Sequence, residues 1–267
     1  MFNSISMTYL SATISECLGI KPPMEAEKSA PMVAERVQAK CHKPVDRVLI
    51  YNPDALGMWM FQKYTSEFAP VMERTELELP VATVMPSVTP VCFGTMYTGV
   101  LPGVHGIKSY TKPVIKTDSL FDALARAGKK TAIVAVEDSS MAIIFSGRDI
   151  DYFFTKDDKA AEETATELIR DGEYEVIICY NQEFDDVMHE STPESEISLA
   201  AMHHHIDAFA RLSDTVKESW KQYDSLVVCA TDHGTHVDET GYGNHGDYIE
   251  EDINVIHYYG IYPKTEL

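Results

Sequence analysis

Short apolar runs alternate with longer segments of helical character along most of this chain, and this alternation constrains its fold more than any other feature. Strands are expected at 46–52, 79–84, 131–136, 174–180, 225–231 and 253–260. Helices are expected between them, at 56–69, 90–98, 118–127, 159–171 and 195–222. Alternation of this kind predicts an α/β fold, with a mostly parallel central sheet and helices on both of its faces.

The first 45 residues follow a different pattern. Thr8 to Leu18 is amphipathic and can end at Gly19, and Pro31 to Ala39 also favours a helix. The sequence therefore predicts an N-terminal helical extension over residues 1–45, packed on a main domain over 46–267. At 267 residues the chain can form one full core. The segments between the strands are too short to contain a large additional domain.

Three of the apolar runs end at residue types that bind metals. Asp232 and His233 follow the run 225–231, Asp185 and His189 follow 175–180, and Asp54 follows 47–51. In an open α/β sheet, ligands bind where the carboxyl ends of the strands meet the loops. Parallel strands would therefore bring these carboxylates and imidazoles to one edge of the sheet. The arrangement favours a dinuclear metal site.

A threonine with strong helix-start signals lies between two of these strands. Thr89 is an N-cap residue type, Pro90 suits the first helical position, and Gly99 suits the position after the helix end. Backbone N–H groups and the positive end of a helix favour a phosphate at this place. A hydroxyl is a weak nucleophile, but a metal ion can activate it. Thr89 is therefore the candidate nucleophile.

These motifs resemble, in content and order, those of the type I phosphodiesterase/nucleotide pyrophosphatase family within the alkaline phosphatase superfamily. The matching pieces, spread over about residues 46 to 260, are Asp54, the stretch Met85 to Ile107 with Thr89, Thr98-Gly99 and His105-Gly106-Ile107, Asp185 with His189, Thr231 to Gly234, and His245-Gly246. The resemblance implies an alkaline phosphatase-like catalytic domain over 46–267, with Thr89 as the catalytic nucleophile.

The resemblance also implies two divalent cations that share the substrate phosphate. One cation would be held by Asp54, Thr89, Asp232 and His233, and the other by Asp185, His189 and His245, with Asp186 as a fallback ligand. Mixed Asp and His ligands suit Zn²⁺ and tolerate Mn²⁺. If the turn after the strand is helical, Asp185 and His189 lie on one face of it.

One position departs from the family pattern. Cys92 occupies the place, three residues after the nucleophile, where we expect the family to carry an asparagine that binds a phosphate oxygen. A thiol is a much weaker donor than an amide. Cys92 is therefore the candidate substrate-binding residue, and it leaves the choice of substrate open.

The charge of the chain limits its partners. The formal net charge is -20 and no cluster of Lys and Arg offsets it, so binding of a nucleic acid polymer is not expected. Bound cations would reverse the sign of the charge at the site and admit a small anionic substrate. The five cysteines form no C-x-x-C pair, and we find no signal peptide and no apolar stretch that could span a membrane. These features favour a cytoplasmic protein. The oligomeric state stays open.

Two polar runs are expected on the surface. His203-His204-His205 lies in a predicted helix, where consecutive residues face different directions, so a solvated helix start is expected. Glu250-Glu251-Asp252 is expected in a solvated turn.

The predicted function is metal-dependent hydrolysis of a small phosphorylated substrate, a phosphodiester or nucleotide pyrophosphate. The alternatives are a phosphomonoesterase or phosphonate hydrolase of the same superfamily, a phosphomutase, and a metal-binding remnant without activity. A sulfatase is disfavoured because Met85 to Thr89 contains no arginine.

Overall fold

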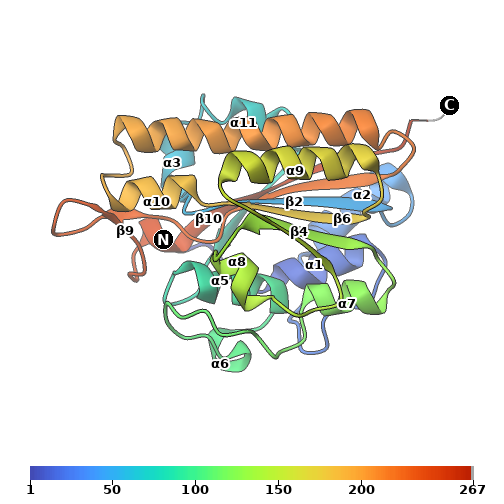
Figure 1. Ribbon diagram of the computed structural model, residues 1–267, viewed down its shortest axis with the longest axis horizontal. Coiled ribbons are helices and arrows are strands. Elements are labelled where there is room, and N and C mark those ends of the chain that lie inside the picture. The colour runs from blue at the N-terminus through green and yellow to red at the C-terminus, as the bar shows by residue number, and fades with distance from the viewer. Residues whose placement is uncertain (266–267) are drawn as a thin grey trace.

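A mixed eight-stranded sheet forms the centre of the computed structural model, which describes residues 1–265 (Figure 1). The strand order is β1-β3-β10-β7-β2-β6-β4-β5, and β10 runs antiparallel to both of its neighbours while the other pairs are parallel. The strands are β1 (Ile5–Ser6), β2 (Arg47–Pro53), β3 (Leu77–Ala82), β4 (Thr131–Val136), β5 (Asp151–Thr155), β6 (Val176–Asn181), β7 (Ser225–Ala230) and β10 (Asn254–Tyr262); β8 (His236–Val237) and β9 (Gly243–Asn244) form a separate hairpin. This architecture confirms the predicted α/β class.

Helices cover both faces of the sheet (Figure 1). One layer contains α3 (Met58–Lys63), α4 (Ala69–Met72), α9 (Asp158–Asp171), α10 (Glu183–His189) and α11 (Glu196–Ser219). The other contains α1 (Tyr9–Cys17), α2 (Pro31–Cys41), α5 (Thr89–Thr98), α7 (Leu120–Arg126) and α8 (Ser140–Ile144), with α6 (Pro102–His105) beyond α5. A short helix, α12 (Glu250–Ile253), precedes β10. Within residues 1–265, the connections between strands contain no large cap domain.

The central strands are apolar because both of their faces are covered. Every residue of β2, β6 and β7 is buried. In β2, Val48 and Ile50 belong to one core cluster, whereas Leu49 and Tyr51 belong to the other. Successive side chains of a strand point to opposite faces, so one strand contributes to both cores.

Four predicted helices match single helices of the structure, but the one expected at 56–69 is divided into α3 and α4. A turn separates them, in which the Thr65 hydroxyl donates to the carbonyl of Phe61. Such local side-chain bonding competes with the continuation of a helix. The prediction from sequence also did not include β5, at one edge of the sheet, or β1, at the other edge.

Residues 1–45 contribute to the same core as the rest of the chain. β1 pairs in parallel with β3, and Met7, Leu10 and Ile14 are fully buried in the core cluster of the α5 face. None of the helices that the structure describes combines the length and the apolar character that crossing a bilayer requires.

Gly260 in β10 lies so close to the backbone of Arg74 that there is no room for a side chain at this position. A Cβ atom at this position would lie 2.1 Å from the carbonyl oxygen of Arg74 and 2.8 Å from Val227 Cγ2. We expect Gly260→Ala to lower the free energy of unfolding by about 2 kcal/mol, because a backbone neighbour cannot move as a side chain can. Urea denaturation would measure the change. Gly103→Ala, where a Cβ meets no atom within 4 Å, is the control and should leave stability unchanged or slightly raised.

Candidate active site

Three adjacent strands bring the predicted metal ligands to one edge of the sheet. β7, β2 and β6 are neighbours and run parallel. Asp54 directly follows β2, Asp232 follows β7 by two residues, and Asp185 lies in the first turn of α10 after β6. The seven predicted ligands therefore meet at the carboxyl ends of these strands, in two sets: Asp54, Asp232 and His233, with Thr89 beside them, and Asp185, His189 and His245.

The first set is almost completely buried. His233 Nε2 lies 3.4 Å from Asp54 Oδ1 and 3.4 Å from Asp232 Oδ2. The Thr89 hydroxyl is 3.3 Å from the same ring nitrogen. Three potential metal ligands, from the segments that follow β2 and β7, therefore lie together with the Thr89 hydroxyl beside one of them.

The second set lies closer to solvent, because His189 is partly exposed. Asp185 Oδ1 is 3.5 Å from His189 Nε2 and 3.4 Å from His245 Nε2. α10 is helical over this stretch, so Asp185 and His189 share a face as the spacing predicted. The imidazole rings of His233 and His245 stack with centroids 3.9 Å apart, which joins the two sets.

Backbone carbonyls determine the tautomer of all three histidines. His233 Nδ1 donates to Gly234, His189 Nδ1 to Gly243 and His245 Nδ1 to Ser87, over 3.0, 3.0 and 2.8 Å. A carbonyl oxygen only accepts, so the proton of each neutral ring is on Nδ1. Each Nε2 therefore presents a lone pair to the neighbouring carboxylates, as in metal-binding histidines.

The carboxylates have the unpaired oxygens that a cation site requires. Asp54 Oδ1, Asp185 Oδ1 and Asp232 Oδ2 are buried and accept no hydrogen bond in the structure. They are the same oxygens that face the imidazole nitrogens. A lone pair thus faces a lone pair at each of these contacts, which is unfavourable unless a proton or a metal cation lies between the two atoms. The two sets fit a pair of divalent cations.

The electrostatics of the site agree with this geometry. Burial and the nearby charges of Asp232 and Asp185 raise the pKa of Asp54 well above its usual range. Burial and Asp232 raise the pKa of Asp185 in the same way, and burial raises that of Asp232 to about 6. Burial lowers the pKa of His233 to about 3, so this imidazole is neutral and free to bind a metal.

α5 begins one residue earlier than the sequence indicated. The cap position is Val88, and Thr89 is the first helical residue instead of the N-cap. Pro90 follows within the first turn, and Gly99 ends the helix with a φ of 74°, as expected. Thr89 is thus at the positive end of α5, with its hydroxyl directed at His233.

Cys92 lies inside the protein and not in the open site. Its side chain has no exposed surface and belongs to the core cluster beneath Thr89, and burial raises the pKa of its thiol well above the usual range. Cys92 thus has no exposed surface through which to contact a substrate, and its substrate-binding role stays a prediction. One turn after Thr89, its side chain points into the sheet-facing core.

Two tyrosines that were not predicted from the sequence interact with the carboxylates of the site. The buried Tyr180 hydroxyl donates to Asp54 Oδ2. Tyr110 is 60% exposed, and its phenol has a raised pKa, first through burial and then through the charges of Asp185 and Asp54. Neither tyrosine lies in a recognisable motif, so no sequence signal could have identified them.

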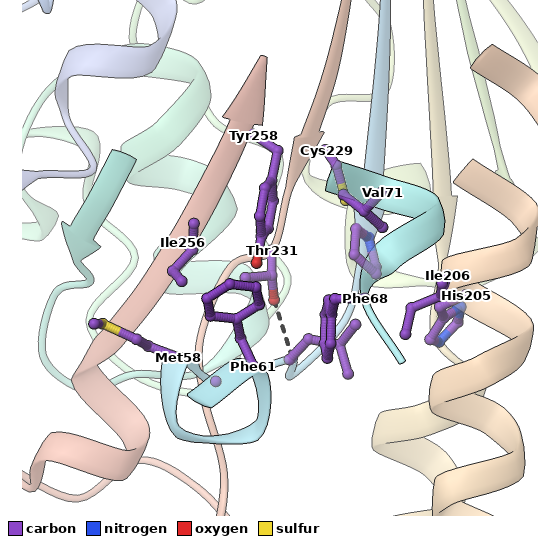
Figure 2. Close-up of a pocket in the computed structure, with 13 residues that line it drawn as sticks. Met58, Phe61, Phe68, Val71, His205, Ile206, Cys229, Thr231, Ile256 and Tyr258 are labelled. Atoms are coloured by element: carbon purple, nitrogen blue, oxygen red, sulfur yellow. Dashed lines mark hydrogen bonds between the residues drawn. The ribbon is translucent and has the colours of Figure 1, made fainter. Parts of the chain in front are cut away.

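An apolar cavity lies next to the loops that carry Asp54 and Asp232, since the adjoining residues Pro53 and Thr231 line it. Figure 2 shows the side chains of its wall. Its wall includes Thr231, whose hydroxyl accepts a 3.0 Å hydrogen bond from the backbone N–H of Leu56. The volume is about 20 Å³, which is room for one water molecule. None of the predicted site residues lines it. The cavity is therefore too small and too apolar for a phosphorylated substrate.

Comparisons with known proteins identify the family of the chain. The sequence matches the family model described as type I phosphodiesterase/nucleotide pyrophosphatase over residues 51–264. A comparison with curated protein sequences finds no match.

The fold is similar to several solved structures. Murine ectonucleotide pyrophosphatase/phosphodiesterase 5, in an inactive form with AMP, is 14% identical with a TM-score of 0.58, over 73% of this chain and 59% of that one. Phosphonoacetate hydrolase from Sinorhizobium meliloti with phosphonoformate is 17% identical with a TM-score of 0.55, over 72% and 57%. The periplasmic domain of the phosphoethanolamine transferase EptC from Campylobacter jejuni is 13% identical with a TM-score of 0.57, over 81% and 79%. The chain thus spans less than two thirds of the first two proteins.

Proposed function

The chain belongs to the type I phosphodiesterase/nucleotide pyrophosphatase family, and we propose that it is a metal-dependent phosphoester hydrolase in which Thr89 is the nucleophile. The observation that carries this proposal is the position of the Thr89 hydroxyl, at the start of α5 and 3.3 Å from His233 Nε2 within the first ligand set. In the same proposal, residues 46–267 form the catalytic domain and residues 1–45 an N-terminal extension.

The donor atoms fit two transition-metal cations. Asp54, Asp232 and His233, with Thr89, would hold one, and Asp185, His189 and His245 the other. Mixed carboxylate and imidazole ligands suit Zn²⁺ and tolerate Mn²⁺. Bound cations would lower the pKa of the Thr89 hydroxyl and balance the charge of the phosphoryl group.

The residues of the chain then account for the reaction. The Thr89 oxygen releases its proton to solvent and forms a bond to phosphorus while the bond to the leaving oxygen breaks. The leaving group departs with that electron pair and takes a proton from solvent. Water next attacks the phosphothreonine, which releases phosphate or a phosphomonoester and restores the hydroxyl. The positive end of α5 stabilises the negative charge on the phosphoryl oxygens in both steps.

The substrate is a small phosphodiester or nucleotide pyrophosphate. The AMP bound to the murine relative and the phosphonoformate bound to the hydrolase are both small anions with phosphorus–oxygen groups, which supports this class. The ligand sets open to solvent at His189, and residues 1–265 contain no large domain over them. The leaving group should therefore be small or weakly selected. A phosphonate is the second candidate because of the similarity to phosphonoacetate hydrolase.

Hydrolysis of two chromogenic esters tests the proposal. With Zn²⁺ or Mn²⁺ we expect bis-p-nitrophenyl phosphate to be cleaved faster than p-nitrophenyl phosphate, and both rates to vanish with a chelator. Preference for the monoester would indicate a phosphomonoesterase. Phosphate release from phosphonoacetate alone would favour the phosphonate alternative, and no turnover with bound metal would contradict the proposed activity.

A further inference from the structure

The helix that carries two of the proposed ligands has no caps of its own. α10 has seven residues, and Gln182 at its cap position makes no side-chain cap hydrogen bond. The first N–H groups of a helix need partners from outside the helix, and a helix this short is not stable alone. The orientation of Asp185 and His189 therefore depends on whatever holds α10.

Two residues from other helices bind the first backbone N–H groups of α10. Asp158, the first residue of α9, accepts from the N–H of Gln182 and of Glu183 through Oδ2, at 2.8 and 2.7 Å. His205 of α11 accepts from the N–H of Phe184 through Nε2, at 3.2 Å. Asp185 is the next residue. Three consecutive N–H groups before this ligand are thus bound by side chains that are distant in sequence.

The burial and the hydrogen bonds of His205 suit it to accept from a backbone N–H. It is buried in the middle of α11, which corrects the expectation of a solvated side chain at this position, whereas His203 is exposed as expected. A backbone N–H only donates, so Nε2 carries no proton, and Nδ1–H donates to the Tyr51 hydroxyl at 3.0 Å. Burial lowers the pKa of His205 to about 3, which keeps the ring neutral. In Figure 2 its side chain lies on α11 at the edge of the apolar cavity.

The other end of α10 is held as well. His189 Nδ1 donates to the carbonyl of Gly243, and the N–H of Gly243 donates to the carbonyl of Ser191 at 2.9 Å. This end is tied to the hairpin β8–β9, which leads to the third ligand His245. A helix bound at both ends cannot rotate, and its ligand face stays directed at His245.

We propose that Asp158 and His205 are positioning residues that cap α10 and thereby form the metal half-site of Asp185, His189 and His245. This inference rests on the proposed function, because it takes these three residues as ligands. Asp158 and His205 contact neither the ligands nor the substrate, so their effect is confined to one of the two cations.

Paired substitutions test this role. His205→Leu and Asp158→Ala remove the acceptors, whereas Asp158→Asn retains an oxygen acceptor and His205→Gln places an amide oxygen near the position of the ring nitrogen. His203→Leu, on the same helix but partly exposed beside Glu67, is the control. We expect the first two variants to weaken one of two zinc equivalents by about 10- to 100-fold in competition with a chromophoric chelator, while the other equivalent is unchanged. The Gln and Asn variants should restore it.

Hydrogen exchange in metal-free protein tests whether Asp158 and His205 hold α10, independently of the proposed hydrolase activity. We expect the amides of α10 to exchange faster in His205→Leu and Asp158→Ala than in the wild type, with α5 unchanged. Equal weakening of both zinc equivalents, or unchanged zinc binding and unchanged exchange, would overturn the inference. Wild-type protein that binds no zinc would instead contradict the proposed function, and the exchange result would still decide whether the two residues hold α10.

Discussion

Replacing Thr89 with alanine is expected to lower kcat for bis-p-nitrophenyl phosphate by at least about 10³-fold, since the oxygen that attacks phosphorus is removed. The backbone of α5 should not change, because Thr89 is the first helical residue and its side chain caps no backbone N–H there. Zinc binding by Asp54, Asp232 and His233 should persist with reduced affinity, since these three ligands remain in place.

Thr89→Ser and Thr111→Ala complete the experiment. Serine retains the hydroxyl and should recover most of the lost rate, whereas Thr111 is an exposed loop residue and its substitution should have no effect. Rapid quenching with a labelled substrate should trap phosphate on the wild-type protein and not on Thr89→Ala. An alanine variant that retains full turnover with both cations bound would exclude Thr89 as the nucleophile.

The central sheet could be predicted because its strands are covered on both faces. β2, β6 and β7 are continuous apolar runs with turn or polar residues at their ends, a pattern that is typical of the central strands of a parallel sheet. β5 was missed because it is an edge strand: it is partly exposed along its length and begins with Asp151. β1 has two residues, too few for any periodicity.

The ligands of the candidate site could be predicted for a related reason. Asp54, Asp185 and Asp232 each follow a recognisable strand, so the topology alone places them together. Their supporting residues could not be predicted, because Tyr180 and Asp54 are 126 residues apart in sequence and neither position is unusual by itself. The surroundings of Asp252 could not be predicted from the sequence either. This residue was expected in a solvated turn but is buried, where it accepts from His236 Nδ1 at 2.8 Å.

Addition of zinc is expected to stabilise the protein strongly, and more so at alkaline pH. In the metal-free protein the pKa of Asp232 is raised by burial to about 6, above the value of 3.8 for an exposed aspartate. The folded state therefore binds this proton more tightly than the unfolded chain. The resulting stability is complete below the unfolded pKa and is lost as the pH rises through the folded pKa. Asp54 and Asp185 act in the same direction.

The effect should be visible in thermal unfolding followed by circular dichroism. A pKa shift of this size at Asp232 alone corresponds to about 3 kcal/mol in the free energy of unfolding, or about 10 °C in the unfolding midpoint for a chain of this length. In the presence of a chelator, the midpoint should fall by about half that amount between about pH 5 and about pH 8, since part of the stability is already lost at pH 5, and saturating zinc should restore it because the cation replaces the lost proton.

Asp232→Asn provides the matched control. The amide has nearly the shape of the carboxylate but no charge to bury, so the metal-free variant should be more stable than the wild type near pH 8 and should respond much less to zinc. A wild-type midpoint that is independent of both pH and zinc would mean that these carboxylates are not mutually repelling ligands. The buried cluster at the ends of β2 and β7 would then have a purely structural role.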